Sequence, residues 1–387
     1  MVGSELSEEQ IAALEQMTNR SALGCVVGVA GTGKSTILDV ARQAWEAQGL
    51  QVYGAALAGK AADGLQAASG ISSRTLAALE KSWDHGYEPI PSGSVLVVDE
   101  VGMVGTRQLN RVMSQLAERN CKVVLVGDPE QLQPIQAGTP FRDLLALHGH
   151  AKMQDVRRQR ESWQREASVS LSKGHTEEAM AAYEIRGHVN TATSHDDAVA
   201  SLVQDYLADM IRSPASKSRL ALAHRRKDVF AINQGIRAEL LARDVLKTEI
   251  MVDTDHGPRA FAAGDRVMFT RNDRTLGVKN GMLGTITDVS HTALRIAPDD
   301  GGRDIFVDAN DYCSIEHGYA VSIHKSQGCT VDHTFILGTK TLDEHLTYVA
   351  MTRHKETATM YHGPERRRHE QKFSSLGQRK QRTGLSR

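Results

Sequence analysis

The chain has 387 residues, 40% of them hydrophobic, and its 46 lysine and arginine residues nearly balance its 47 aspartate and glutamate residues. This length suits two or three domains with real cores, and the near-neutral charge excludes a uniformly basic surface, so any nucleic-acid site must be a local groove. The four cysteines have no C-x-x-C spacing. The sequence also has no apolar run of membrane-spanning length and no signal-peptide pattern. We therefore expect a cytoplasmic protein without membrane contact.

Near the N-terminus, Ser7 and Gln10 precede an apolar helical repeat in the pattern of a capping box. Capping alone explains Gln10. A glutamine just upstream of a phosphate-binding loop can also recognise adenine through its side-chain amide, so two roles are open at this position.

Residues 28–35 match the P-loop pattern G-x-x-x-x-G-K-[ST] at every position, between an apolar strand and the start of a helix. The glycines let backbone N–H groups surround phosphates, and the dipole of the helix that begins at the end of the loop attracts them. Lys34 is expected to reach the β- and γ-phosphates, and Ser35 to ligate Mg²⁺. The sequence thus predicts a site for ATP and Mg²⁺.

An expected strand over 51–57 ends in small residues and is followed by the segment 59–65, and a further helix opens at 72–76. Loops at the strand ends of a parallel sheet are where ligands bind, so both segments are candidates for contacting a substrate beside the nucleotide. The stretch 81–94 is rich in turn residues, which predicts a loop or a small hairpin.

Residues 94–100 form a buried-strand run that closes with two carboxylates, the Walker B arrangement of P-loop enzymes. Asp99 is expected to hold Mg²⁺ through its water shell, and Glu100 to orient and deprotonate the attacking water. Another strand, over 121–126, leads into a polar loop in which Gln131 would face the γ-phosphate and report hydrolysis to the neighbouring domain.

The second half of the chain begins with three arginines within 157–160, a run that on its own is typical of a solvated basic face. A strand over 220–223 and a helix over 228–241 follow, and short alternating strands with turn signals over 261–312 predict a small β-barrel insertion. From Gly363 the tail carries eight basic and two acidic residues, which predicts a disordered segment that either binds a phosphate backbone or only aids solubility.

Six segments, in order, resemble the motifs of superfamily 1 helicases of the RecD-like, 5′-to-3′ branch, and most closely the helicase portion of the Ti-type conjugative relaxases called TraA. The segments are GVAGTGKST, VVDEVGM, GDPEQLQPI, VRRQ, HKSQG and YVAMTRHK. The resemblance covers about residues 6–356 and implies an α/β fold with two RecA-like P-loop domains. These are a first domain over 1–152, a second over 153–362 with an SH3-like β-barrel inserted at about 261–312, and a basic tail over 363–387.

The resemblance also implies roles for individual residues. Glu100 is expected to be the general base, Gln131 the γ-phosphate sensor, and Arg353 and Arg158 the arginines that a second domain brings to the γ-phosphate, with Arg158 preferred over Arg157. The expected ATP ligands are Gln10, Gly28, Gly31, Thr32, Gly33, Lys34, Ser35, Thr36 and Gly328, and the expected Mg²⁺ ligands are Ser35 and Asp99. The expected contacts to single-stranded DNA are Lys60, Thr75, His324, Ser326 and Gln327.

Three features depart from the family pattern. Val101 stands where the family has alanine, which leaves both carboxylates in place. The 81–94 loop is short for a strand-separating pin, so translocation is better supported than processive unwinding. We find neither the N-terminal nicking tyrosine nor the three-histidine cluster of a relaxase, and the H-x-H pair of His148 and His150 lies between helicase motifs, where we expect a surface loop.

These features predict an ATP- and Mg²⁺-dependent DNA helicase that acts as a monomer on single-stranded DNA and on junctions with duplex, with conjugation or repair proteins as partners. Two alternatives stay open. One is a translocase that remodels nucleoprotein or acts on RNA without separating strands. The other is a recruitment module that binds DNA or a conjugation partner without useful turnover, although six intact motifs argue against it.

Overall fold

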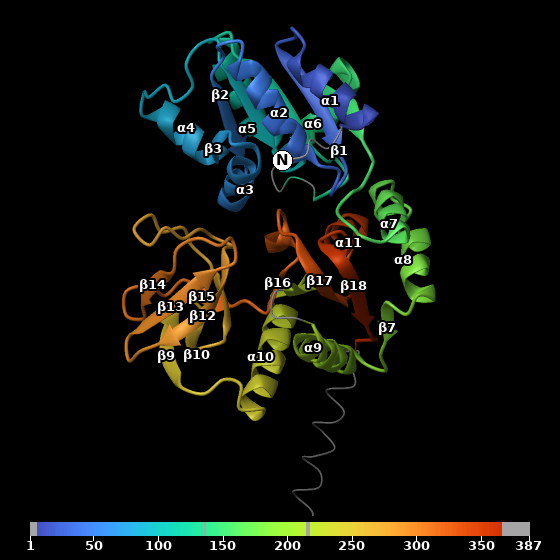
Figure 1. Ribbon diagram of the computed structural model, residues 1–387, viewed down its shortest axis with the longest axis vertical. Helices are drawn as coiled ribbons and strands as arrows, with labels where there is room; N and C mark the ends of the chain where they lie inside the picture. Colours follow the sequence, from blue (N-terminus) through green and yellow to red (C-terminus); the bar gives the residue numbers. More distant parts are fainter. Residues whose placement is uncertain (1–5, 133, 135–136, 214–216, 366–387) are drawn as a thin grey trace, which may run out of the picture.

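The computed structural model describes residues 6–132, 134, 137–213 and 217–365. The basic tail from 366 onward, together with positions 133 and 135 of the predicted third motif, lies outside this range. Figure 1 shows an upper α/β unit, a lower α/β unit, and an antiparallel β region beside the lower one. In the described residues, no helix combines the length and the apolar character that crossing a membrane would require.

The upper unit is a six-stranded parallel sheet in the order β3-β2-β4-β5-β1-β6. Its strands are β1 (Leu23–Gly28), β2 (Val52–Ala56), β3 (Ser72–Thr75), β4 (Val95–Asp99), β5 (Lys122–Gly127) and β6 (Ala151–Met153). Its helices are α1 (Glu8–Thr18), α2 (Lys34–Glu46), α3 (Gly59–Ser69), α4 (Leu76–Asp84), α5 (Thr106–Ala117) and α6 (Pro140–His148), with the short 3₁₀ helix η1 (Val101–Met103) after β4.

Helices cover both faces of this sheet because its strands are apolar on both sides. Along β4, Leu96 and Val98 pack into the cluster formed with α4, α5 and α6, whereas Val95 and Val97 pack into the opposite cluster with α1 and α2. Successive side chains of a strand point to opposite faces, so a continuous apolar run fills two cores. The predicted Walker B strand is therefore central and buried.

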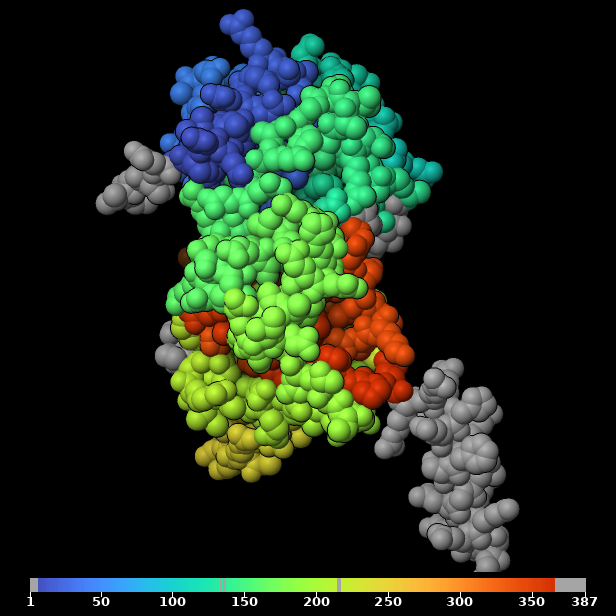
Figure 2. All heavy atoms as spheres, turned by 90° about the vertical axis from the view of Figure 1, so that its right-hand side faces the viewer, coloured from blue at the N-terminus to red at the C-terminus, as the bar shows by residue number. Residues whose placement is uncertain are grey.

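The lower unit is a five-stranded parallel sheet in the order β16-β8-β17-β18-β7. Its strands are β7 (Val189–Thr191), β8 (Arg219–Ala223), β16 (Ala320–Ser322), β17 (Val331–Gly338) and β18 (His354–His362). Its helices are α7 (Ser162–Ser172), α8 (Thr176–Ile185), α9 (His195–Arg212), α10 (Arg226–Ala242) and α11 (Glu344–Met351), with the 3₁₀ helix η2 (His324–Ser326) after β16. Figure 2 shows the green surface of the α7 and α8 region where the two units meet.

The antiparallel region lies between α10 and β16 in the chain. It contains the hairpin of β9 (Glu249–Thr254) and β10 (Gly257–Ala262), and a five-stranded sheet of β11 (Arg266–Phe269), β12 (Leu283–Val289), β13 (Ala293–Pro298), β14 (Ile305–Asp308) and β15 (Ile315–His317). Its own hydrophobic cluster includes Phe261, Phe269 and Ile296. An ion pair between Lys279 of this region and Asp63 of α3 joins it to the upper unit.

The α/β class with two parallel sheets and an inserted β region is confirmed. Two local predictions differ from the structure. The expected loop over 81–94 starts inside α4, which continues to Asp84 and ends before Gly86, a glycine with a φ of 75°. The β insertion is larger than 261–312, because paired strands already begin at Glu249 and the last one ends at His317. The exact domain limits stay predictions.

Candidate nucleotide and nucleic-acid site

The P-loop connects β1 to α2 through backbone conformations that favour glycine. Gly31 has a φ of 90° and Gly33, the N-cap of α2, has a φ of 84°. Both values lie in the left-handed region, which side chains with a Cβ rarely occupy. A Cβ on Gly31 would also lie 2.6 Å from the Cβ of Arg158. The loop thus brings the start of α2 and the predicted arginine together.

Lys34 and Gln10 both lie against this loop. The Lys34 Nζ donates to the carbonyls of Gly28, at 2.8 Å, and Val29, at 3.4 Å, which holds the ammonium inside the loop. Gln10 is 3% exposed, and its Oε1 accepts from the Ser7 backbone at 3.1 Å, as a capping box requires. Its Nε2 donates to the Thr32 carbonyl at 3.4 Å. Capping therefore places the amide at the P-loop, and both roles considered for Gln10 are compatible.

Two carboxylates stand at the end of the buried strand β4, Asp99 as its last residue and Glu100 directly after it. Burial and the neighbouring Glu100 raise the pKa of Asp99 to about 6, while Lys34 acts in the opposite direction. Asp99 and the neighbouring Glu100 supply the hard oxygen ligands that suit Mg²⁺, and Lys34 of the P-loop is close enough to act on Asp99, so the residues present fit this ion. Glu100 has a φ of 52°, a left-handed conformation that is uncommon for a residue other than glycine. Such strained backbone is frequent at functional sites.

The two predicted arginines meet beside the P-loop. Arg353 follows α11, is 2% exposed, and donates through Nε to the Val349 carbonyl at 2.9 Å. An Arg158 guanidinium nitrogen donates to the Thr352 carbonyl at 2.7 Å. Burial and the charge of Arg353 lower the pKa of Arg158 to about 9, whereas Glu100 acts in the opposite direction.

Neither Arg158 nor Arg353 forms an ion pair with any residue that the structure describes. Two neighbouring guanidinium groups without a carboxylate partner create a positive potential that an anion such as a phosphate would relieve. Arg157 differs, because its side chain is exposed and pairs with Asp155 at 3.2 Å. The geometry thus favours Arg158 over Arg157 as the partner of Arg353.

The predicted sensor loop after β5 is tied to the lower unit by a tyrosine. Gln131 is 3% exposed, its Nε2 donates to the Asp128 carboxylate at 3.3 Å, and its Oε1 has no partner among the described residues. The hydroxyl of Tyr348, on α11, donates to Asp128 at 2.5 Å and accepts from the Ala30 N–H at 3.0 Å. Sequence reasoning missed Tyr348, and its position as the first residue of the sixth motif was the available signal.

The connection between the units is itself bonded to the P-loop. The Val29 N–H donates to the Met153 carbonyl at 3.1 Å, and the Arg157 N–H donates to the Gly31 carbonyl at 2.8 Å. Apolar residues of both units, among them Ala30 and Val349, share one hydrophobic cluster. The P-loop is therefore part of the contact between the units.

Three predicted DNA contacts line one cavity between the upper unit, the lower unit and the β region. This interface cavity has a volume of about 190 Å³, and Lys60, His324 and Gln327 line it. Glu100 and Gly328 line it as well, so Gly328, which was expected at the nucleotide, shares this cavity with Glu100. The Lys60 Nζ donates to the Cys329 thiol sulfur at 2.7 Å, across the boundary of the two units.

The other two predicted DNA contacts have structural partners. Ser326 is fully buried, and its hydroxyl donates to the Ile323 carbonyl at 2.7 Å, so it stabilises the turn and is not available to DNA in this conformation. The Thr75 hydroxyl caps α4 by accepting from the Ala78 N–H at 3.1 Å, and Thr75 does not line the interface cavity. Thr36, expected at the nucleotide, is exposed at the start of α2.

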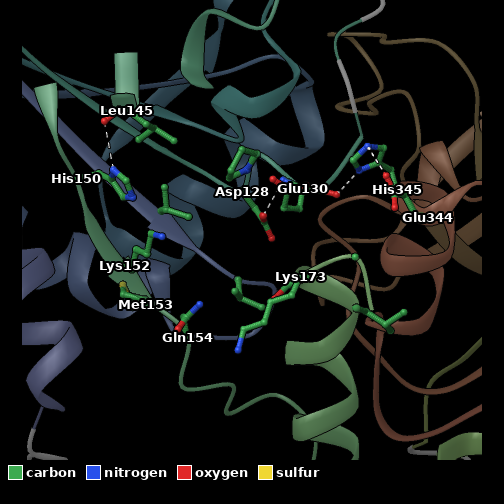
Figure 3. A pocket seen from close by; sticks show the side chains of 16 residues that line it. Asp128, Glu130, Leu145, His150, Lys152, Met153, Gln154, Lys173, Glu344 and His345 are labelled. Carbon is green, nitrogen blue, oxygen red and sulfur yellow. Dashed lines mark hydrogen bonds and ion pairs between the residues drawn. The ribbon is translucent and has the colours of Figure 1, made fainter. Parts of the chain in front are cut away.

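A larger hollow of about 580 Å³ lies on the β6 side of the sensor loop (Figure 3). Asp128 and Glu130 line it from the loop, and His345 lines it from α11 and donates through Nδ1 to the Glu130 carbonyl at 2.6 Å. Of the two histidines that we expected in a surface loop, His148 is instead the last residue of α6. His150 lies in the short connection between α6 and β6 and lines this hollow.

Comparison with known proteins agrees with this geometry. Residues 5–194 match the model of a family described as AAA domain. A conjugal transfer protein TraA of Agrobacterium fabrum is 42% identical over 360 residues, which are 92% of this chain and 32% of that protein. The chain thus spans about a third of the length of its TraA relatives. An ATP-dependent RecD2 DNA helicase of Deinococcus radiodurans is 28% identical over 91% of this chain and 48% of its own.

Solved structures resemble the whole chain. The Pif1 helicase from Bacteroides, in complex with ADP-AlF₃ and ssDNA, superposes with a TM-score of 0.61 at 19% identity and covers 97% of each chain. At this identity the likeness shows the fold, which has the RecA-like domains that the sequence predicted. The chain is thus related in sequence to the conjugal transfer protein TraA and to RecD-like helicases.

Proposed function

We propose that the chain is an ATP-dependent DNA motor that moves 5′ to 3′ on single-stranded DNA and couples hydrolysis to duplex unwinding. The observation that carries the proposal is the meeting of Arg158 and Arg353 with Glu100 and the P-loop at the boundary of two parallel sheets. Such a site is complete only when both units are close, so turnover and movement are coupled.

In the proposed cycle, Lys34 and the P-loop N–H groups hold the phosphates of ATP. Ser35 and Asp99 would hold Mg²⁺, which supplies charge neutralisation for phosphoryl transfer. Glu100 accepts a proton from the attacking water, and Arg158 and Arg353 stabilise the negative charge that develops on the γ-phosphate. Once phosphate leaves, the anion that attracts both arginines of the second unit toward the P-loop is lost, which favours separation of the units.

The names of the relatives support DNA as the polymer along which the protein moves and conjugal transfer as the process in which it acts. TraA relatives are named conjugal transfer proteins, one RecD relative is named a DNA helicase, and one Pif1 structure contains single-stranded DNA. We infer a division into domains over 1–152 and 153–362, and a monomer as the working unit. Both remain part of the proposal, as does the 5′-to-3′ direction.

The first experiment is steady-state ATP hydrolysis with and without single-stranded DNA, followed by unwinding of forks with 5′ or 3′ tails. Lys34→Ala protein serves as the blank, because it lacks the ammonium that the loop holds. Strong stimulation by DNA that is absent in the variant supports the motor. Hydrolysis that stays unchanged with any nucleic acid would overturn it in favour of a recruitment module or a partner-activated ATPase.

A second candidate is a translocase that does not separate strands. The observation that favours it is the short loop over 85–94 after α4, which contains no strand and therefore no β-hairpin pin. DNA-stimulated hydrolysis without unwinding of forked DNA or RNA duplexes would identify this activity.

A further inference from the structure

A hollow of about 460 Å³ lies between α10 and the β region, outside the nucleotide site. We call it the insertion groove. It adjoins the interface cavity, because Lys325 and Asn280 line both. A polymer that passes Lys60, His324 and Gln327 would therefore reach the insertion groove next. None of its α10 or β10 residues was singled out from the sequence.

The groove contains a half-exposed aromatic ring. Phe230 projects from α10 and is 48% exposed, although it is a large apolar side chain. The Arg259 guanidinium, from β10, lies 5.0 Å from the centre of the Phe230 ring. An exposed ring next to an arginine is a surface on which a nucleobase stacks, because every base has a flat π-face.

The rest of the lining favours a phosphate backbone. Arg226, Arg259 and Lys325 supply cations, against Asp255 and Glu316. Lys325 forms no ion pair within the part of the chain that the structure describes. Burial lowers the pKa of Lys325, Arg226 adds to the effect, and Glu316 opposes it. The two cations repel each other, and an anion between them would relieve this repulsion.

The carboxylates of the groove are already engaged. Glu316 lies 3.3 Å from the His256 Nε2, and that same ring nitrogen contacts the Arg226 guanidinium. Asp255 accepts from the Ser314 hydroxyl at 2.6 Å. The groove therefore keeps Lys325 and the Phe230 ring as its unsatisfied features, one suited to a phosphate and one to a base.

We propose that the insertion groove binds one unstacked nucleobase and the adjoining phosphates of the single-stranded DNA that occupies the interface cavity. Phe230 provides the stacking surface, and Arg226 and Lys325 contact phosphates. The groove extends the track beyond the motif residues and adds a stacking contact that tolerates any base. This inference rests on the proposed DNA motor and identifies a further part of its substrate site.

The chain offers a matched pair of variants for the test. Phe306 on β14 is 59% exposed and has the Arg295 guanidinium 5.0 Å from its ring centre, the same arrangement as at Phe230, but it does not line the groove. Phe230→Ala and Phe306→Ala thus remove similar exposed rings from the same protein. Thermal unfolding of both variants verifies that each stays folded.

Fluorescence anisotropy would measure the affinity of wild type and both variants for oligodeoxynucleotides in which one position at a time is abasic. Stacking of one base contributes roughly 1–3 kcal/mol, so Phe230→Ala should weaken binding of the intact strand by roughly 5-fold to 150-fold. At one position, removal of the base should weaken wild type and leave Phe230→Ala unaffected. Phe306→Ala should bind as wild type does.

The proposal would be overturned if the losses of affinity caused by Phe230→Ala and by an abasic site simply added at every position. Equal losses of affinity in Phe230→Ala and Phe306→Ala would also overturn it. The same non-additivity seen only with RNA would overturn DNA as the occupant. Hydrolysis assays on wild type separate this proposal from the motor. If DNA stimulates wild type and Phe230→Ala binds DNA normally, the groove assignment alone fails; if wild type neither binds nor responds to DNA, both fail.

Discussion

Tyr348 gives the sharpest prediction, because a single hydroxyl joins the two units. It donates to Asp128 of the sensor loop at 2.5 Å and accepts from the Ala30 N–H of the P-loop at 3.0 Å. Tyr348→Phe removes both hydrogen bonds and leaves the buried ring in place. Asp128 keeps donors from Gln131 and the Glu130 N–H, but the Ala30 N–H loses its side-chain partner.

The magnitude follows from these contacts. A hydrogen bond to a carboxylate contributes about 1.5–3 kcal/mol, and an unsatisfied buried N–H costs about 1–3 kcal/mol. Because Asp128 retains other donors, we expect a loss near the lower end, about 1.5–2 kcal/mol, for the closed arrangement. Such a loss shifts the equilibrium between closed and open units roughly tenfold or more toward open.

Fluorescence energy transfer between dyes on the two units, together with ATP hydrolysis, would measure this shift. Tyr348→Phe should lower the closed fraction and raise the KM for ATP. The control is Tyr361→Phe, which removes a buried hydroxyl that donates to Asp205 at 2.8 Å within the lower unit. The control should lose stability and keep normal closure and KM. Unchanged closure in Tyr348→Phe, or an equal change in Tyr361→Phe, would refute the reasoning.

Three further variants test other parts of the site. Glu100→Gln should abolish turnover while ATP and DNA stay bound, as filter binding and rapid-quench hydrolysis would show, because the base that accepts the proton is lost. Gly31→Ala should weaken nucleotide binding by at least roughly 5-fold to 30-fold, measured with a fluorescent ATP analogue. A φ of 90° costs alanine about 1–2 kcal/mol, and its Cβ would overlap Arg158. A hydrogen bond from Lys217 holds the pKa of Glu356 below its usual range. Glu356→Gln should therefore destabilise the protein at neutral pH, and the loss should shrink as the pH falls through that pKa. Urea unfolding at several pH values would measure this.

Each of these predictions has a clear contrary result. Normal hydrolysis by Glu100→Gln would show that another group is the base. Gly64→Ala is the neutral control for Gly31→Ala, because Gly64 lies within α3 and no atom lies within 4 Å of its added Cβ. Equal nucleotide affinity of the two variants would contradict the argument from backbone strain. A stability difference for Glu356→Gln that is the same at every pH would contradict the role of its ionisation.

The sequence predicted those features whose chemistry is local. The P-loop spacing, the carboxylates after an apolar strand and the Ser7 capping box depend on neighbouring residues, and the structure places these elements as expected. Features that depend on distant partners were missed. The bond between Tyr348 and Ala30 joins residues 318 positions apart, and the contact of Lys60 with Cys329 spans 269 positions.

The wrong predictions about the burial of Ser326 and about where the β region begins have a similar cause. The burial of Ser326 is decided by the packing of the turn after β16, although its neighbours His324 and Gln327 line the interface cavity. The first strands of the β region were missed because Glu249–Thr254 contains two acidic residues and is stabilised mainly by pairing with β10. Hydrophobic periodicity describes how apolar and polar residues alternate within one short stretch of sequence, and it does not identify the strand with which that stretch pairs.

The hydrogen bonds between the P-loop and the connecting segment have a mechanical consequence. The Gly31 carbonyl of the P-loop accepts a hydrogen bond from the backbone N–H of Arg157, and Arg158 is the next residue. A shift of the loop by a fraction of an ångström on phosphate binding would thus move the segment that connects the two units directly, without deforming the sheet behind it. If the chain is the proposed motor, force generation would depend on the stiffness of a few backbone hydrogen bonds near Gly31. Its speed would then be sensitive to substitutions in 153–158 that touch neither nucleotide nor DNA.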